Sequence, residues 1–499
     1  MNEEMGNCKE ANTFSLVPPT HDMHVLGSKW VFRVKLNEDG SLDKFQARLV
    51  AQGFKQEEGI DYLETYSPVV RTATVRAVLH FATTMNWEIK QMDVKNAFLH
   101  GDLTETVYMK QPAGFVDEQY PDHVCLLHKS LYGLKQSPRA WFDKFSNFLL
   151  EFGFTCSLRD PSLFVCFKGK NVIMLLLYVD DMAITGNSSE LLQDLLEQLN
   201  TQFRMKDLGK LRYFLGIQIQ YHDGGMFLSQ QKYAEDLIRL QLLKRILRYI
   251  KGTTTMGISF DKYLDSNLTT YSDSDYAGCE KSSRSTGGFC TFLGRNMISW
   301  SSRKQETVSK SSTEAEYRAM SEAASEITWF VNLLQDLGVK LTATPELFCD
   351  NLSAVYITAN PSFHARTKHF ATHYYYVREQ VAFGNIIVNH ISADYQLADI
   401  FTKSLPQRPF EILRLKIGVG LPPTPSLRGS VKKCVQNDTA LQKGLLGPRP
   451  NTFPKPTSTQ RIPAKHDKEI RKTSPADCTA LPTKNQFAVL EPCDENDAT

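Results

Sequence analysis

The sequence predicts two successive mixed α/β regions followed by an unfolded tail, and three observations support this fold class. Predicted strands and amphipathic helices alternate over residues 28–240 and again over residues 269–405. From about residue 406, prolines punctuate a segment rich in threonine, lysine and asparagine. That segment (406–499) has too few apolar residues to offset the entropy of ordering, so we expect it to be mostly disordered.

Composition limits the class of protein. A hydrophobic content of 42% and a charged content of 22% in 499 residues are ordinary for globular protein. The net charge of +2 does not indicate a nucleic-acid partner, but two local basic stretches do, Lys29–Lys55 and Lys244–Lys251. The ten cysteines lack C-x-x-C spacing, which argues against a zinc ribbon. The longest apolar run, Val172–Val179, is far short of the roughly 20 residues that cross a bilayer. The N-terminus has no apolar signal region, so we expect an intracellular chain.

The first α/β region, residues 28–240, shows helical and strand periodicity in turn. Helices are predicted where apolar residues repeat with helical spacing, at Arg71–Asn86, Pro138–Phe152 and Ser189–Phe203. Strands are predicted at Ser28–Leu36, Ala47–Gly53, Glu88–Asp93 and Val172–Val179, and a hairpin at Arg212–Tyr221 and Gly225–Ser229. Residues 236–252 have the pattern of one basic amphipathic helix ending at Gly252, which a solvated connecting helix would also explain.

The second α/β region, residues 269–405, has a similar alternation. Strands are predicted at Thr269–Tyr276, Gly287–Trp300, Glu346–Asp350 and Ile386–Ile391, and helices at Ser312–Leu337 and Ala371–Phe383.

One acidic constellation lies in the first region. The apolar run that ends at Val179 leads directly into Asp180 and Asp181, two adjacent carboxylates that repel each other unless a hard cation such as Mg²⁺ neutralises them. A solvated turn would explain the pair equally well on its own. Asp93 ends another predicted strand and supplies a third carboxylate, which permits two metals about 4 Å apart for phosphoryl transfer. Phe98, five residues later, could press on the sugar of an incoming nucleotide.

Six ordered motifs of this region resemble the reverse transcriptase of copia-type LTR retrotransposons. They are Lys29-Trp-Val-Phe, Ala47-Arg-Leu-Val-Ala-Gln-Gly-Phe, Tyr66-Ser-Pro-Val-Val-Arg, Gln91-Met-Asp-Val-Lys-Asn-Ala-Phe-Leu-His-Gly, Leu131-Tyr-Gly-Leu-Lys-Gln-Ser-Pro-Arg-Ala-Trp and Tyr178-Val-Asp-Asp. The resemblance implies a fingers-and-palm fold that copies an RNA or DNA template into DNA. It assigns the metal ligands to Asp93, Asp180 and Asp181 and the gate that excludes ribonucleotides to Phe98. It also places Gln136 in the nucleotide pocket, Arg48 near the triphosphate, and Phe214-Leu-Gly-Ile at the primer end.

A second acidic constellation lies on separate elements of the second region. Carboxylates end strands at Asp273 and Asp350, open the long helix at Glu316, and follow later at Asp399. Four such groups could bind two Mg²⁺ ions and activate water against an RNA phosphodiester. Asp275 and Glu314 are the alternatives, and Glu314 would also suit a helix N-terminus without any catalytic role.

Six motifs of this second region resemble the ribonuclease H domain of the same elements. They are Tyr271-Ser-Asp-Ser-Asp-Tyr-Ala-Gly, Ser285-Thr-Gly-Gly, Ser299-Trp-Ser-Ser-Arg-Lys-Gln, Ser312-Thr-Glu-Ala-Glu-Tyr-Arg-Ala, Cys349-Asp-Asn and Ala398-Asp-Ile-Phe-Thr-Lys. The resemblance implies a ribonuclease H-like fold whose four acids match Asp273, Glu316, Asp350 and Asp399. The pair His369 and His373 lacks the glutamate of a zinc motif, so a phosphate-contacting basic patch is favoured over a zinc site.

Together the patterns predict an enzyme in five segments. Residues 1–27 lead into fingers and palm (28–240), residues 241–268 are a thumb or connection remnant, and the hydrolytic domain (269–405) precedes the tail (406–499). The family usually has a longer segment before Lys244, so the chain is expected to lack most of its thumb. The predicted function is RNA-directed DNA synthesis with degradation of RNA in hybrids. The alternative is a degenerate or co-opted product that binds nucleic acid without processive synthesis.

The resemblance also implies cofactors, partners and a location. The cofactors are two Mg²⁺ ions per active site, with Mn²⁺ as a substitute. The partners are RNA template, DNA primer, RNA–DNA hybrid and dNTPs, with no membrane. The expected location is the cytoplasm, in virus-like particles if the element is active, with the nucleus as an alternative.

Overall fold

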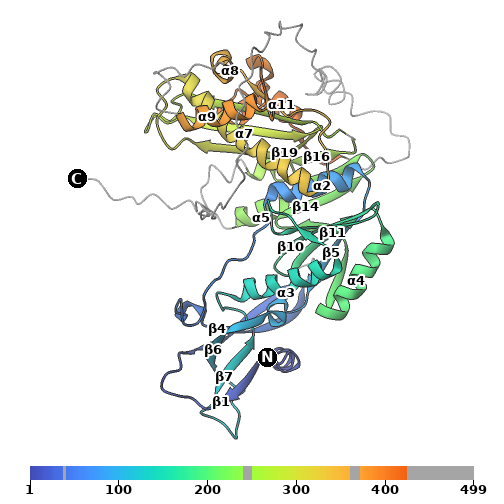
Figure 1. The fold of residues 1–499 in the computed structure, drawn as a ribbon, viewed down its shortest axis with the longest axis vertical. Coiled ribbons are helices and arrows are strands. Elements are labelled where there is room, and N and C mark those ends of the chain that lie inside the picture. Colours follow the sequence, from blue (N-terminus) through green and yellow to red (C-terminus); the bar gives the residue numbers. More distant parts are fainter. Residues whose placement is uncertain (37–40, 240–249, 264, 360–370, 424–499) are drawn as a thin grey trace, which may run out of the picture. The chain divides into compact units, whose positions relative to one another are not determined.

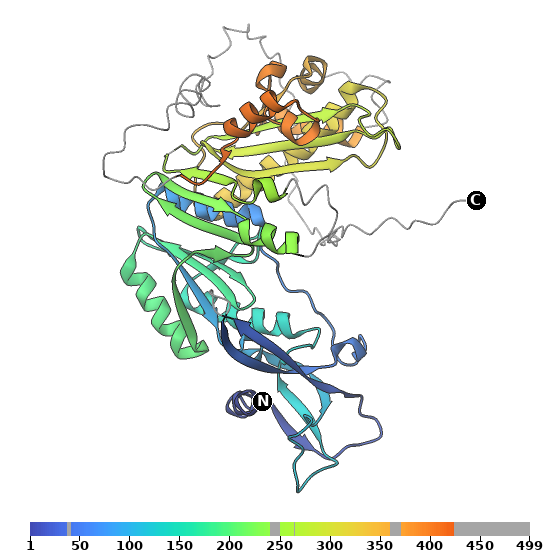
Figure 2. The ribbon, with the colours of Figure 1, turned by 180° about the vertical axis from the view of Figure 1, so that it is seen from behind.

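The computed structural model describes residues 1–36, 41–239, 250–263, 265–359 and 371–423 (Figure 1). The N-terminal part contains α1 (Asn2–Glu10) and a four-stranded sheet in the order β1-β7-β6-β2. The strands of this sheet are β1 (Phe14–Val17), β2 (Val25–Leu26), β6 (Asp102–Lys110) and β7 (Val124–Lys129). Beside it, β3 (Ser28–Leu36) and β4 (Leu42–Ala51) form a separate antiparallel hairpin that carries the predicted basic strands (Figure 2). The short 3₁₀ helix η1 (Gly53–Lys55) follows β4.

A six-stranded sheet in the order β12-β5-β11-β10-β9-β8 forms the palm. Its strands are β5 (Ile89–Val94), β8 (Thr155–Cys156), β9 (Leu163–Lys168), β10 (Asn171–Tyr178), β11 (Asp181–Gly186) and β12 (Met205–Lys210). Because side chains of a strand alternate between faces, Ile173 and Leu175 pack with α3 and α4 while Met174 and Leu176 pack with α2. The apolar run before Asp180 is therefore a central strand buried on both faces.

Local sequence explains the three palm helices α2 (Thr72–Thr84), α3 (Ser137–Phe152) and α4 (Ser189–Phe203). The side chain of Ser188 accepts a hydrogen bond from the Leu191 backbone N–H, as an N-cap should. Pro138 stands in the first turn of α3, and Gly153 ends that helix in the left-handed conformation with φ 106°. These are the helices that the apolar periodicity predicted.

A five-stranded sheet follows in the order β13-β14-β15-β16-β22. It contains β13 (Tyr213–Phe214), β14 (Ile217–His222), β15 (Gly225–Ser229), β16 (Gly257–Asp261) and β22 (Val419–Gly420). The strand predicted over residues 212–221 is broken, because Leu215 and Gly216 both adopt positive φ and turn the chain between β13 and β14. The predicted remnant at 241–268 supplies β16, which pairs directly with β15.

The helix predicted over residues 236–252 falls largely outside the described residues. The described part is α5 (Gln231–Arg239), and residues 250–252 are again helical. The prediction of one continuous helix through 240–249 is therefore not tested.

The second α/β region is built on a five-stranded sheet in the order β19-β18-β17-β20-β21. Strands β17 (Leu268–Asp275), β18 (Thr286–Leu293) and β19 (Asn296–Lys304) are antiparallel, whereas β20 (Glu346–Cys349) and β21 (Ile387–His390) run parallel to β17. The helices are α7 (Ser312–Asp336), α8 (Leu352–Ala359), α9 (Ala371–Ala382) and α10 (Asp399–Thr402), with the 3₁₀ helix η4 (Ala393–Tyr395). The predicted strand over residues 287–300 is in fact two strands joined at Gly294, where φ is 58°.

The predicted tail begins later than residue 406. Residues Gln407–Lys416 form α11, and the chain then pairs with β16 through β22. Leu413 and Ile417 are buried in a core with Tyr271 and Phe292. The predicted boundary at residue 406 was based on the proline content. The apolar residues of α11, however, have the helical spacing that lets one face of a helix be buried.

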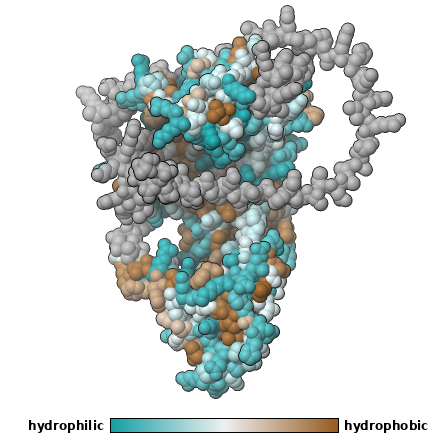
Figure 3. Space-filling model, turned by 90° about the vertical axis from the view of Figure 1, so that its left-hand side faces the viewer, coloured by the Kyte–Doolittle hydropathy of each residue, from teal (hydrophilic) through white to brown (hydrophobic). Residues whose placement is uncertain are grey.

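Apolar side chains also remain at the surface. Phe32 and Phe45 on the β3–β4 hairpin are 69% and 76% exposed. On the face that Figure 3 presents, apolar side chains are scattered among hydrophilic ones in the lower part of the molecule. No helix among the described residues is long and apolar enough to cross a membrane.

Candidate active sites

The three palm aspartates meet at one end of the central strands. Asp93 lies near the end of β5, and Asp181, the first residue of β11, is its direct cross-strand partner. Asp181 also pairs with Tyr178 of β10, which leaves Val179 and Asp180 as a two-residue hairpin turn. The sheet therefore brings together all three carboxylates predicted from the sequence.

The turn that carries Asp180 has an unusual backbone. Val179 adopts φ 54°, a left-handed conformation that is a genuine outlier for a β-branched residue. Two hydrogen bonds hold the turn: the Trp141 indole N–H donates to the Val179 carbonyl oxygen at 2.6 Å, and the Val94 N–H donates to the Asp180 carbonyl oxygen at 3.0 Å. The turn is thus fixed from α3 on one side and from β5 on the other.

The palm carboxylates repel one another. Burial raises the pKa of Asp181 to about 6, and the neighbouring charges of Asp180 and Asp93 add to this rise. A divalent cation would relieve both causes, because it replaces the lost hydration and neutralises the charges. Among the described residues, this trio is not one of the groups whose ligand atoms all lie within 4.8 Å of one another. The palm site has the donors for a metal but holds them apart.

Phe98 and Arg48, both predicted to bind the nucleotide, contact the same side chain. That side chain is Tyr132, which the sequence did not identify as a site residue. Phe98, in the 3₁₀ helix η2 (Ala97–His100), packs edge-on against Tyr132 with ring centroids 5.0 Å apart. The Arg48 guanidinium of β4 lies over the same tyrosine ring at 4.5 Å. Burial raises the pKa of Tyr132 to about 12, with Asp180 and Asp93 among the lesser causes. Tyr132 therefore links the predicted gate, the basic finger strand and the palm carboxylates.

A tight backbone approach fixes Tyr132. The Ala51 N–H donates to the Tyr132 carbonyl oxygen at 2.8 Å, which joins the turn to β4. The next residue, Gly133, adopts φ 92°, and a Cβ there would lie 2.2 Å from the Ala51 carbonyl oxygen. Only glycine fits, and this explains the Tyr-Gly step in the motif that begins at Leu131. Its place within the motif that begins at Leu131 was the one available signal for Tyr132.

Gln136 is 2% exposed, and its side-chain amide is engaged inside the protein. It donates to the Asp61 carbonyl oxygen at 2.8 Å and accepts from the Gln56 amide at 3.0 Å. These contacts brace the start of α3, and the role of Gln136 in nucleotide binding stays a prediction.

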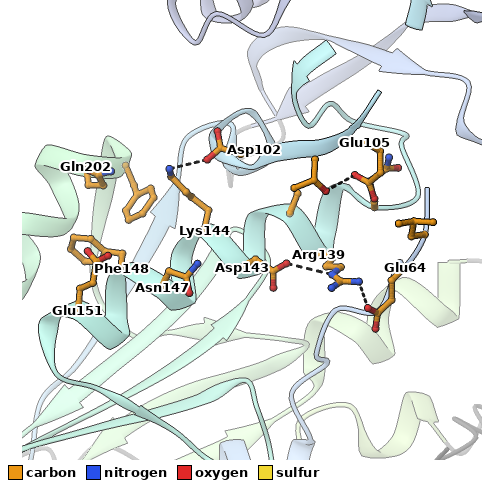
Figure 4. Close-up of a pocket in the computed structure, with 15 residues that line it drawn as sticks. Glu64, Asp102, Glu105, Arg139, Asp143, Lys144, Asn147, Phe148, Glu151 and Gln202 are labelled. Carbon is orange, nitrogen blue, oxygen red and sulfur yellow. Dashed lines mark hydrogen bonds and ion pairs between the residues drawn. The ribbon is translucent and has the colours of Figure 1, made fainter. Parts of the chain in front are cut away.

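A polar groove runs along α3 (Figure 4). The two basic side chains of its lining are paired: Lys144 binds Asp102 at 2.9 Å, and Arg139 binds Asp143 at 3.4 Å as well as Glu64. Since both cations are engaged by carboxylates, the groove gives no indication of an anionic ligand.

The second acidic cluster draws on four separate elements. Asp273 lies on β17, Glu316 in the first turns of α7, Asp350 directly after β20, and Asp399 at the start of α10. Carboxylate oxygens of Asp273, Asp350 and Asp399 lie within 4.8 Å of one another, and Glu316 is equally close to Asp350 and the Cys349 sulfur. The structure brings all four predicted acids together.

The carboxyls of this cluster are more deeply buried and repel one another more strongly than those of the palm. Burial raises the pKa of Glu316 to about 9, and the charges of Asp273 and Asp350 add to that rise. Burial likewise raises the pKa of Asp399 to about 6 and that of Asp350 above its usual range. These raised pKa values mean that the carboxyls resist ionising when no cation is present. A hard divalent cation binds carboxylate oxygens in their ionised form, so it would stabilise the charged state of the cluster.

A lysine from the same motif stands inside the cluster. The Lys403 ammonium lies 3.0 Å from Asp273 and 2.7 Å from Asp399, and Thr402 also donates to Asp273. Although burial opposes protonation, the hydrogen bonds and charges of Asp399 and Asp273 raise the pKa of Lys403. Asp273 is fully buried, so these contacts supply the partners that a buried carboxylate needs.

The two alternative acids have structural partners. Glu314 is 1% exposed, accepts from the Lys310 N–H at 2.8 Å and pairs with Arg318 at 2.8 Å, while Ser311 caps the same helix end. Glu314 therefore caps the start of α7 together with Ser311, and the ion pair with Arg318 holds it there. Asp275 accepts from the Thr286 N–H across β17 and β18. The geometry therefore favours Glu316 and Asp273.

Two further side chains beside this cluster were not predicted from the sequence. The His390 ring nitrogen Nε2 lies 3.1 Å from the Asp350 carbonyl oxygen, and the Cys349 sulfur lies 3.8 Å from Glu316. The predicted patch at Arg366 to His369 lies outside the described residues, so its role is not tested.

The chain has extensive similarity to known proteins. A family model described as reverse transcriptase (RNA-dependent DNA polymerase) matches residues 11–246. The retrovirus-related Pol polyprotein from transposon RE1 of Arabidopsis thaliana is 41% identical over 489 residues, covering 84% of this chain and 33% of the relative. The corresponding polyprotein from transposon TNT 1-94 of Nicotiana tabacum is 35% identical over 499 residues, covering 84% and 37%.

A solved structure of LC11-RNase H1 in complex with RNA/DNA hybrid covers 27% of this chain and 94% of its own, with 17% identity and a TM-score of 0.22, too low to support an argument. The chain spans about a third of the length of the two polyproteins. Across that third, the sequence identity reaches through both acidic sites, and the chain belongs to the family of copia-type retrotransposon Pol polyproteins with a reverse transcriptase domain.

Proposed function

We propose that this chain combines an RNA-directed DNA polymerase in its first α/β region with a ribonuclease H in its second, both acting by two-metal phosphoryl transfer. The observation that carries the proposal is the placement of two separate carboxylate sets. Asp93, Asp180 and Asp181 lie at one end of the central palm strands, and Asp273, Glu316, Asp350 and Asp399 form a close cluster. Each set combines donors from different parts of the chain, which folding alone does not require. The match to a reverse transcriptase model over residues 11–246 supports the polymerase half.

In the palm, the residues provide a site for a primer hydroxyl and a nucleotide. Divalent cations held by the three aspartates would activate the hydroxyl and neutralise phosphate charge. Arg48 offers a planar fork of N–H donors to the triphosphate. Phe98, held against Tyr132, limits the space beside the sugar, so a 2′-hydroxyl would clash. The Phe98 ring would therefore select dNTPs over ribonucleotides.

In the second region, the four carboxylates surround a position for the scissile phosphate of RNA. Asp273 and Asp399 are held by Lys403, which limits repulsion within the cluster. His390 is exposed beside Asp350, with its ring nitrogen Nε2 3.1 Å from the Asp350 carbonyl oxygen. The proposed substrate is the RNA strand of an RNA–DNA hybrid.

A competing function is favoured by one observation. The chain passes from α5 to β16 within the short span 240–256, where the family is expected to have a longer thumb segment. A product that binds nucleic acid and cuts hybrids without processive synthesis would fit that shortening. The hydrolytic cluster does not depend on it.

Primer extension decides between these functions. Purified full-length chain is tested on poly(rA)·oligo(dT) with Mg²⁺ and dTTP, with Asp180→Asn as the matched control. Extension by the parent and not by the variant supports the polymerase. No extension at any salt concentration, with hybrid cleavage retained, supports the competitor. Hybrid cleavage by Glu316→Gln at the parental rate would overturn the ribonuclease H assignment.

A further inference from the structure

The hairpin turn that carries Asp180 combines backbone strain with an external hydrogen bond. Val179 stands at φ 54°, where its branched Cβ crowds the backbone. Such a conformation persists only if surrounding contacts over-determine it, and strained residues of this kind gather at functional sites. The contact from outside the sheet is the Trp141 indole, which donates to the Val179 carbonyl oxygen at 2.6 Å.

Trp141 is itself held firmly. It is 1% exposed, and its ring packs against Phe145 at 5.2 Å and Phe203 at 5.4 Å between centroids. Its indole N–H has one strong acceptor to reach, and that acceptor is the carbonyl oxygen of the strained residue. A buried N–H that lost this acceptor would be left unsatisfied, so the bond favours one conformation of the turn.

The orientation of that turn decides where two metal-binding carboxylates point. Asp180 follows Val179, and Asp181 begins the strand that pairs with Asp93. If Val179 relaxed to negative φ, the peptide planes on either side would rotate and carry the Asp180 side chain with them. The Val94 N–H holds the Asp180 carbonyl oxygen from β5 at 3.0 Å, one peptide beyond the carbonyl that the indole holds.

We propose that Trp141 is a positioning residue of the polymerase site, whose indole N–H holds Val179 in the left-handed conformation and so aims Asp180 and Asp181 at the metals. This inference rests on the proposed polymerase function. The proposal gives α3 an indirect part in metal binding, although α3 is far from Asp180 and Asp181 in the sequence. The Trp-to-carbonyl bond stabilises the strained turn, and the turn fixes the carboxylates.

The test uses Mn²⁺ binding, followed by the spectroscopic signal of free Mn²⁺, in the full chain with Glu316→Gln and Asp350→Asn to silence the second cluster. In this background Trp141→Phe keeps an aromatic ring and removes the N–H donor. We expect Mn²⁺ affinity to fall about tenfold, the size of one buried hydrogen bond. Single-nucleotide extension should lose kcat with little change in the KM for dTTP, because Trp141 is 1% exposed and offers no surface to a nucleotide.

Val179→Gly provides the rescue. Glycine adopts positive φ at no steric cost, so the turn no longer needs the indole. The double variant Trp141→Phe with Val179→Gly should bind Mn²⁺ with an affinity within about threefold of Val179→Gly alone. Once Val179→Gly makes the hydrogen bond unnecessary, removing the indole N–H should have little further effect. Phe145→Leu is the packing control in the same aromatic cluster, and it should lower the urea midpoint while leaving Mn²⁺ affinity unchanged.

The outcomes separate this inference from the proposed function. If Asp93→Asn binds Mn²⁺ as tightly as the parent, the palm metal site is absent, and both are overturned. If Asp93→Asn binds weakly but Trp141→Phe binds like the parent, the positioning role alone is wrong. Two further results would overturn the positioning role. One is a loss of Mn²⁺ affinity in Trp141→Phe that Val179→Gly does not rescue. The other is an equal loss of Mn²⁺ affinity in Phe145→Leu. Either result would mean that Trp141 acts only through packing.

Discussion

The two acidic sites of this chain solve the problem of gathering carboxylates in different ways. The palm places Asp93, Asp180 and Asp181 on neighbouring strands and a strained turn, partly open to solvent. The second cluster buries Asp273 fully and Glu316 almost fully, with donors from four elements. In the first site, backbone geometry does the aiming. In the second, tight packing brings the donors together.

This difference has an electrostatic consequence. Burying several like charges costs free energy unless a partner of opposite charge compensates. The buried cluster has such a partner in Lys403, whose ammonium contacts both Asp273 and Asp399. We therefore expect the second cluster to be preformed in the absence of metal. The described palm carboxylates do not all have ligand atoms within 4.8 Å of one another, so we expect them to close on metal binding.

The largest expected effect separates the two sites completely. Asp180→Asn should reduce primer extension about a thousandfold and leave hybrid cleavage intact, and Glu316→Gln should do the reverse. A metal ligand contributes several kcal/mol of transition-state stabilisation, and each 1.4 kcal/mol is a factor of ten. Extension and cleavage are measured on the same purified proteins. Loss of both activities in either variant would mean that the sites are not independent.

Glu314→Gln is the matched control for Glu316→Gln. Glu314 caps α7 and pairs with Arg318, so its loss should lower the free energy of unfolding by about 1–2 kcal/mol. Cleavage by the folded protein should stay within about twofold of the parent, because Glu314 bonds Lys310 and Arg318 and not the clustered acids. A thousandfold loss in this variant instead would exchange the roles of the two glutamates.

A smaller effect concerns pH. Glu316, with its pKa raised to about 9, must lose a proton before it binds metal, whereas Asp181, with a pKa of about 6, is already ionised at neutral pH. Mg²⁺ affinity of the second cluster should therefore rise up to about tenfold per pH unit between pH 6 and 9. Affinity of the palm should level off above about pH 7. Calorimetric titrations on single-site variants measure both, and parallel profiles would contradict the contrast.

Much of the fold was predictable because local pattern determines it. The buried strand before Asp180 and the helix capped by Ser188 have the predicted bounds to within a residue. What the sequence could not indicate depends on contacts between distant segments. Strand β16 joins the sheet of β15, and α11 folds because Leu413 reaches a core that contains Tyr271. No local periodicity reveals such partners.

The sites show the same division. Asp93 was identified by its place at the end of a strand, and Asp399 by the motif that begins at Ala398. Tyr132 and Lys403 lie within the quoted motifs, yet their roles depend on what they touch. Tyr132 lies between Phe98 and Arg48, and Lys403 lies between Asp273 and Asp399. Such bridging positions follow from tertiary packing and not from spacing.

Lys403→Met tests whether the ammonium is what keeps the second cluster assembled. Removing one positive charge should strengthen Mn²⁺ binding by about tenfold, because the cation no longer competes for Asp273 and Asp399. The metal-free protein should unfold at lower urea, since Asp273 stays buried without its ion-pair partner. Lys403→Arg, which keeps the charge, is the control. Weaker metal binding in the methionine variant would show that the ammonium assists the metal.

The smallest expected effect distinguishes the two sites without any metal. In EDTA, Asp181→Asn should stabilise the chain by about 1 kcal/mol above pH 7, because ionising a carboxyl of raised pKa opposes folding. The full pKa shift corresponds to roughly 3 kcal/mol, and solvent screening at the half-buried Asp181 reduces it. The sign follows from linkage: the folded state keeps the proton between the unfolded pKa, about 4, and the folded pKa, about 6, so stability falls over that window. The gain should vanish below pH 4 and stay constant above pH 7. For Glu316→Gln the window extends to about pH 9, so its gain should still be growing at pH 8. Urea unfolding at pH 4, 6, 7 and 8 measures both curves, and a gain for Asp181→Asn that kept rising to pH 8 would mean that the palm carboxylate is as deeply buried as the hydrolytic one.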